Sequence, residues 1–250
     1  QVIAGKDERD ATSTDIPVDD YVGKLDQDTV ETIGVPFHLL EEGVHPDVKA
    51  TFEHTIDILK KNGKKITDIS LPHLSYSIAV YYILATAEAS SNLARFDGVR
   101  YGKRHSEKVD SINDFYSINR EYGFGPEVKR RIMLGTYVLS SGYYDAYYAR
   151  AQKVRRLIYE DFQTALKTVD TIILPTCPTP PFKLGEHLDD PISMYLSDIF
   201  TVSINIAGIP GLSVPIGHSE KGLPIGMQIM GNLYEEARIL QLGNTIESLL

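Results

Sequence analysis

Residues 201–231 read TVSINIAGIPGLSVPIGHSEKGLPIGMQIMG, and this stretch decides the fold. It contains two apolar runs, residues 212–217 and 224–230, which are separated by the polar, turn-forming residues 219–222. Runs of Val, Ile, Leu and Met of this length, bounded by Gly and Pro, are typical of buried strands. A short connection that contains Gly222 suits a hairpin. The stretch therefore predicts two strands of a buried sheet that follow each other directly.

Residues 205–211 (NIAGIPG) come just before this pair and are predicted to form a turn that is too apolar for a solvated loop. Gly208 and Gly211 can adopt a positive φ or let another part of the backbone approach closely. The local composition leaves a second interpretation open, in which this is an ordinary tight turn between core elements.

Composition sets limits on the class of protein. The chain has 250 residues, of which 42% are hydrophobic, and this is enough to bury a sizeable core. No run approaches the roughly 18 apolar residues of a membrane span, so no membrane contact is expected. The single Cys177 rules out an internal disulfide framework and fits a cytoplasmic location. A net charge of −9 without a long basic run makes the chain poorly suited to bind phosphate backbones by itself.

Hydrophobic periodicity predicts helices and strands in alternation, which indicates an α/β fold. A short strand that leads to a turn is expected at 33–40, and further strands at 65–71 and 170–174. The continuous apolar run of the last is typical of a strand buried on both faces. Helices are expected from Pro46 to a stop at Gly63, at 75–96, 127–139, 143–169 and 234–250, and as a short segment near Phe115. Because no repeat or low-complexity linker interrupts the pattern, residues 1–250 are expected to form a single domain.

The sequence offers no local constellation for catalysis or for a metal. The seven histidines are scattered without the spacing of metal ligands, and both a phosphate-binding glycine loop and a G-x-S-x-G elbow are absent. No neighbouring histidine or helix start would lower the pKa of Cys177, so a nucleophilic role is disfavoured. The serine pairs 90–91 and 140–141 lack a base in sequence and are interpreted as small residues at helix contacts or helix ends.

The stretch that decides the fold also carries a family resemblance. Its pattern N-x-A-G-x-P-G-x-S-x-P-x-G, followed by G-L-P-I-G-x-Q, is similar to the C-terminal core hairpin of the amidase signature family. Further segments that resemble this family are 88–102 (EASSNLARFDGVRYG), 130–155, 174–178 and 189–198. The resemblance covers nearly all of this chain but only the later half of the family's length. It implies a mixed β-sheet covered by helices on both faces, as the later half of an amidase-signature core.

The resemblance also implies an activity. The chain looks most like the glutamine-hydrolysing subunits of tRNA-dependent amidotransferases, whose catalytic groups are a lysine and two serines, one of them in a cis peptide. The stretch G-G-S-S-G-G-S that carries part of this machinery is absent from the 250 residues. The chain also opens with Gln1 rather than methionine. We therefore expect a fragment without catalytic residues of its own, inactive by itself, with the triad upstream of residue 1.

The expected partners are those of a cytoplasmic, heterotrimeric ligase of protein biosynthesis. By resemblance, the subunit releases ammonia from glutamine and passes it to a partner subunit, with two further subunits, B and C, in the complex. The partner would use ATP and magnesium to convert Glu-tRNA(Gln) to Gln-tRNA(Gln), so the contact with tRNA would be indirect. No cofactor or metal is expected in this chain.

Matching the family's motifs position by position assigns its glutamine-binding residues to Tyr82, Arg131 and Asp198. Free glutamine presents an α-carboxylate and an α-ammonium, which call for an arginine and a carboxylate. Each residue also has a structural alternative. Arg131 could pair with Glu127 on a solvated helix face, Asp198 could cap a helix beginning at Ile199, and Tyr82 could be part of the core.

Two other functions remain open. The first is a general amidohydrolase of the same family that acts on another small amide. Arg131 and Asp198 argue against it, because a neutral amide offers neither a carboxylate nor an ammonium to pair with them. The second is a non-catalytic binding or assembly module, which is the literal description of a chain that lacks the catalytic half.

Overall fold

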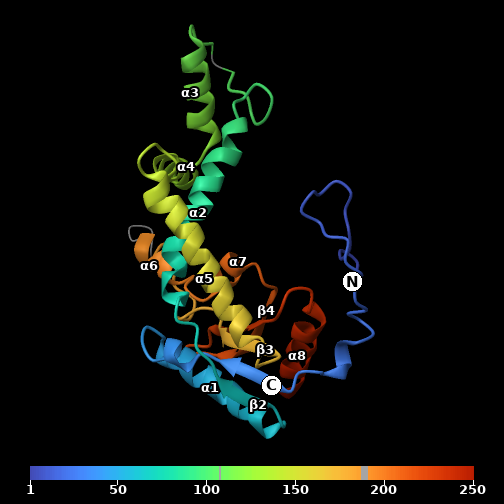
Figure 1. Ribbon diagram of the computed structural model, residues 1–250. Coiled ribbons are helices and arrows are strands. Elements are labelled where there is room, and N and C mark those ends of the chain that lie inside the picture. Colours follow the sequence, from blue (N-terminus) through green and yellow to red (C-terminus); the bar gives the residue numbers. More distant parts are fainter. Residues whose placement is uncertain (107, 187–190) are drawn as a thin grey trace. The chain divides into compact units, whose positions relative to one another are not determined.

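The computed structural model describes residues 1–106, 108–186 and 191–250 (Figure 1). The chain divides into two compact units: Gln1–Ser75 with Leu157–Leu250 form unit 1, and Tyr76–Arg156 form unit 2. The expectation that the whole chain forms a single domain stays a prediction.

Unit 1 is built on a five-stranded mixed sheet with the strand order β2-β1-β3-β5-β4. The strands are β1 (Thr32–Val35), β2 (Lys65–Asp68), β3 (Thr171–Pro175), β4 (Gly211–His218) and β5 (Pro224–Met230). Strand β1 pairs in parallel with β2 and β3, whereas β5 runs antiparallel to β3 and β4. The predicted α/β class and the hairpin of residues 212–230 are therefore confirmed.

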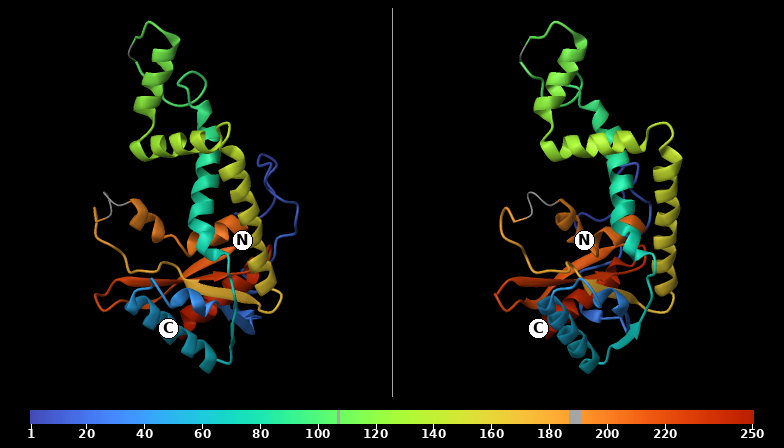
Figure 2. Two further views of the ribbon diagram at one scale, coloured as in Figure 1. Left: turned by 60° about the vertical axis from the view of Figure 1, so that its left-hand side comes forward. Right: turned by 90° about the vertical axis from the view of Figure 1, so that its left-hand side faces the viewer.

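Helices cover both faces of this sheet, as the resemblance implied. Figure 2 shows α1 (Pro46–Lys61) and α8 (Glu236–Leu249) on one face, with α7 (Thr201–Ala207) on the other. Pro46 opens α1, and Phe52 and Leu59 are fully buried along its inner side. All five residues of β3 are buried, so the prediction of a strand buried on both faces is confirmed.

The structure corrects three of the predicted element boundaries. Residues 205–207 are not part of a turn but end α7, because Val202 and Ile206, one turn apart, are both buried. The turn is confined to Gly208, which ends the helix with a φ of 71°. Strand β2 stops at Asp68 and not at residue 71, and the predicted helix at 143–169 begins as a π-helix (Tyr144–Ala149) before α5 (Arg150–Ala165).

Unit 2 consists of helices joined by loops, and its described residues form no strand. It contains α2 (Ser77–Asn92), α3 (Ile112–Gly123), α4 (Pro126–Val138), the π-helix and the first residues of α5. The remaining helical segments of the chain are α6 (Pro191–Leu196) and 3₁₀ turns at Leu25–Gln27, Phe37–Leu40, Leu74–Tyr76 and Leu93–Arg95. None of the helices that the structure describes has the length and apolar character needed to cross a membrane.

Candidate functional site

The close crossing of α2 and α4 in unit 2 positions two of the three predicted glutamine-binding residues. Gly135 of α4 lies so near the backbone carbonyl of Thr86 on α2 that a side chain at position 135 would overlap it. Arg131 lies one helical turn before Gly135, and Tyr82 lies one turn before Thr86. The crossing therefore brings the Arg131 guanidinium over the Tyr82 ring, with 5.7 Å between the guanidinium carbon and the ring centroid.

One edge of the Arg131 guanidinium is fixed by a hydrogen bond to Glu127. Its Nε donates a 3.0 Å hydrogen bond to Glu127, which is the helix-face pair that the alternative interpretation expected. Glu127 also accepts a 2.7 Å bond from the neighbouring Arg130. Within the described residues the Nη atoms of Arg131 make no hydrogen bond, so the edge formed by the two Nη groups is available for a second carboxylate.

The charge on Arg131 is well stabilised. Partial burial opposes this charge, but the hydrogen bond and carboxylate of Glu127, with smaller effects of Tyr82 and Tyr81, outweigh it and raise the pKa of Arg131. The side chain is 34% exposed, which leaves it partly desolvated yet accessible. A fixed, permanently charged donor of this kind suits the binding of a small carboxylate.

Asp198 belongs to unit 1, in the turn between α6 and α7. Its backbone carbonyl accepts hydrogen bonds from the amides of Thr201 and Val202, and its side chain is exposed. The alternative that Asp198 caps a helix beginning at Ile199 is wrong about the helix, because α7 begins at Thr201 with Phe200 in the cap position.

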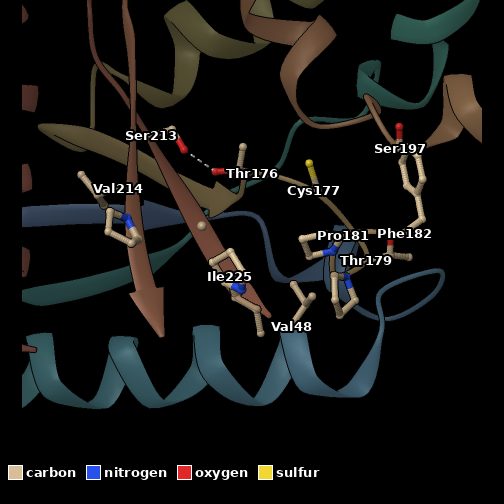
Figure 3. Close-up of a pocket in the computed structure, with 14 residues that line it drawn as sticks. Val48, Thr176, Cys177, Thr179, Pro181, Phe182, Ser197, Ser213, Val214 and Ile225 are labelled. Atoms are coloured by element: carbon tan, nitrogen blue, oxygen red, sulfur yellow. Dashed lines mark hydrogen bonds between the residues drawn. The ribbon is translucent and has the colours of Figure 1, made fainter. Parts of the chain in front are cut away.

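A cavity of about 360 Å³ lies in unit 1 beyond the carboxyl end of β3 (Figure 3). Thr176 and Ser213, which both line it, turn their hydroxyls toward each other, with a hydrogen bond of 2.9 Å between the oxygens. Gly226 lies beneath this pair, and a Cβ there would come within 3.0 Å of the Thr176 hydroxyl. Carboxyl ends of strands are the usual location of binding sites in α/β sheets. The cavity can therefore hold a small ligand against two hydroxyls.

Cys177 and Ser197 also line this cavity, and the charge of Asp198 acts on the pKa of the Cys177 thiol. Partial burial and the negative charge of Asp198 raise the pKa of the Cys177 thiol. The thiol is therefore protonated at neutral pH, whereas a nucleophilic cysteine needs a lowered pKa.

Three of the four paired serines donate hydrogen bonds to nearby backbone carbonyls. Ser90 and Ser91 both donate to the carbonyl of Ala87, and Ser140 donates to the carbonyl of Tyr137. Over the parts of the chain that the structure describes, no group of three His, Cys, Asp or Glu residues could hold a metal ion.

Sequence reasoning missed Gln228, a buried polar residue of β5 that pairs with Ser213 of β4. It is 2% exposed and sits opposite Leu174 of β3 and Ser213 of β4. Its Nε2 donates to the Phe200 carbonyl at 2.9 Å, while its buried Oε1 has no partner among the described residues. Its place in the G-L-P-I-G-x-Q motif was the available signal, because a polar residue inside an otherwise apolar strand needs a reason.

Comparison with known proteins gives the family context. The family model described as Amidase matches residues 1–240. The A subunit of the glutamyl-tRNA(Gln) amidotransferase of Acidobacterium capsulatum is 56% identical over 99% of this chain, and the match covers 52% of that relative. The protein of the same name from Desulfatibacillum aliphaticivorans is 52% identical over 98% of this chain and is covered to 50%.

Solved structures agree with these relatives. The crystal structure of the corresponding glutamyl-tRNA(Gln) amidotransferase subunit from Thermotoga maritima is 35% identical, with a TM-score of 0.72 over 95% of this chain and 46% of that one. A crystal structure described only as an amidase, 22% identical with a TM-score of 0.69, shares the fold. The chain thus spans about half the length of the curated relatives it matches.

Proposed function

We propose, from the premise that this chain belongs to the amidase family, that it forms the later half of a glutamine-hydrolysing amidotransferase subunit. The similarity to subunits of that name supports the proposal, together with the match to about half of their length. Hydrolysis would proceed through the family's serine, cis-serine and lysine in the other half. The chain alone should therefore release no ammonia from glutamine.

The observation that carries the proposal is the Arg131 guanidinium, fixed by Glu127 at one edge and open at the other, above Tyr82. In the proposed function this open edge binds the α-carboxylate of glutamine, and Tyr82 forms the wall against which the substrate packs. Asp198 would pair with the α-ammonium. These contacts position the substrate for attack rather than take part in bond breaking.

The partners in this proposal are two further subunits, B and C, of a heterotrimeric, cytoplasmic amidotransferase. The partner subunit would bind ATP and magnesium and would hold Glu-tRNA(Gln), to which the released ammonia is transferred. The names of the relatives support this setting, since they describe one component of an amidotransferase for glutamyl-tRNA(Gln).

The test compares Arg131→Lys with Arg130→Lys in the assembled amidotransferase, with either glutamine or ammonium as the nitrogen donor. Both arginines pair with Glu127, but Arg130 is 52% exposed and serves as the matched control. Lysine keeps the charge and loses the planar fork. A lost hydrogen bond to a charged group costs roughly 1.5–3 kcal/mol, so kcat/KM for glutamine should fall about tenfold or more in Arg131→Lys.

In Arg130→Lys we expect a change of less than about twofold, because exposed ion pairs contribute little. Ammonium should support amidation equally in both variants, since it bypasses the glutamine site. Equal glutamine kinetics in the two variants would show that Arg131 is only a helix-surface residue.

A further inference from the structure

The two units carry opposite net charges. Unit 2 contains thirteen Lys and Arg residues against eight Asp and Glu, a formal charge of +5, although the whole chain has a charge of −9. Unit 1 accordingly carries −14, with twelve basic and twenty-six acidic residues. The negative net charge of the chain thus comes from unit 1 alone, whereas unit 2 has a positive net charge.

Four of the thirteen basic residues of unit 2 lie in the loop before α3. Residues 98–109 contain four Lys or Arg and one Glu. Lys103, Arg104 and Lys108 are exposed, and none of the three forms an ion pair with any residue that the structure describes. Arg104 and Lys108 line a hollow of about 790 Å³ between this loop and the first turns of α3. Among the lining residues that the structure describes, Asp110 is the acidic one.

Aromatic rings accompany these cations. The Arg104 guanidinium carbon lies 5.0 Å from the centroid of the Phe115 ring, and Phe115 lines the same hollow. His105 stacks on Tyr122 with 4.4 Å between the ring centroids and an angle of 21°. Tyr122 is 67% exposed. We call Lys103, Arg104, His105, Lys108, Phe115 and Tyr122 the basic–aromatic surface.

We infer that the basic–aromatic surface of unit 2 binds a single-stranded segment of RNA. Cations beside the exposed Tyr122 ring and the half-buried Phe115 ring match a strand that offers phosphates and splayed bases together. An acidic protein would offer carboxylates to the cations but no flat bases to the rings. The inference goes beyond the proposed hydrolysis of glutamine and depends on different residues, so either can fail without the other.

The test measures binding of a labelled single-stranded RNA of about 20 nucleotides to the 250-residue chain by fluorescence anisotropy. Nonspecific affinities of this type are on the order of 10⁻⁶ to 10⁻⁴ M at physiological salt. If three phosphates are neutralised, a plot of log K against log salt should have a slope of about −2. The substitution Lys103→Gln/Arg104→Gln/Lys108→Gln should weaken binding at least about tenfold at low salt and remove most of this slope.

The matched control is Lys60→Gln/Lys61→Gln/Lys65→Gln, which removes three exposed cations from unit 1 and should change RNA affinity less than about twofold. Tyr122→Leu keeps every charge, so it should lower affinity about fivefold or more without changing the salt slope. The substitution Lys103→Gln/Lys108→Gln leaves the Arg104–Phe115 contact intact, so it should weaken RNA binding without disturbing the fold. Circular dichroism of each variant would report a folding defect.

Three results would overturn the inference. The first is that the wild-type chain does not bind the RNA. The second is that the two triple substitutions weaken binding equally, which would indicate only the effect of net charge. The third is that polyglutamate binds as tightly as RNA and Tyr122→Leu has no effect, which would indicate an acidic protein partner.

Discussion

The substitution Gly135→Ala probes the helix crossing on which the position of Arg131 depends. An alanine methyl group would overlap the carbonyl oxygen and carbon of Thr86 and crowd the Ser90 hydroxyl. Overpacking usually costs about 1–3 kcal/mol, and a clash with backbone, which has no alternative rotamer, belongs at the upper end. Alanine regains up to about 1 kcal/mol of helix propensity. The free energy of unfolding should therefore fall by about 2 kcal/mol.

Gly123→Ala is the matched control, because it also lies in a helix of unit 2 and an added Cβ there meets no atom within 4 Å. It should be neutral or stabilising by up to about 1 kcal/mol. Urea unfolding followed by circular dichroism at the helical band compares the two variants at equal net charge. If Gly135→Ala unfolds at the same urea concentration as Gly123→Ala, α2 and α4 do not cross as closely as the structure has them.

Two further predictions concern unit 1. Asp170→Ala should destabilise the fold by about 1–3 kcal/mol in urea unfolding, because its carboxylate accepts from the amides of Glu31 and Thr32 and would leave both donors unpaired. Asp57→Ala, which loses only an exposed pair with Lys60, should change the stability by less than about 0.5 kcal/mol; equal losses would contradict the role of Asp170. Asp198→Asn should speed alkylation of Cys177 by iodoacetamide near neutral pH, because removing the negative charge lowers the thiol pKa and increases the thiolate fraction. An unchanged pH profile of alkylation would show that Asp198 does not act on the thiol.

The hairpin of unit 1 was predictable because its information is local. Apolar runs of strand length, separated by residues that favour a turn, specify two buried strands and their order. The same reasoning failed at residues 205–207, where Gly208 and Pro210 suggested a longer turn. Helix α7 extends to Ala207 because burial of Val202 and Ile206 outweighs the nearby turn signal.

No local sequence pattern predicted the division into two units, their opposite net charges or the contacts within unit 2. Unit 2 is an internal segment of the chain, and α5 runs without a break across its boundary after Arg156. No low-complexity linker marks that boundary, so the net charge of −9 was interpreted as a property of the whole molecule. The contact between Tyr82 and Arg131 likewise joins residues 49 positions apart. The family resemblance assigned both residues to one binding site, but neither it nor their spacing predicted the contact.

The proposed glutamine-binding residues depend on different structural supports. Arg131 is positioned by the crossing of α2 and α4 in unit 2, whereas Asp198 is positioned by the turn before α7 in unit 1. A change that loosens the helix crossing should therefore weaken the hold on the α-carboxylate while the effect of Asp198 on Cys177 persists. Gly135→Ala should then raise KM for glutamine in the assembled enzyme without altering the pH profile of Cys177 alkylation. A shift of that profile in Gly135→Ala would show that the supports of Arg131 and Asp198 are coupled.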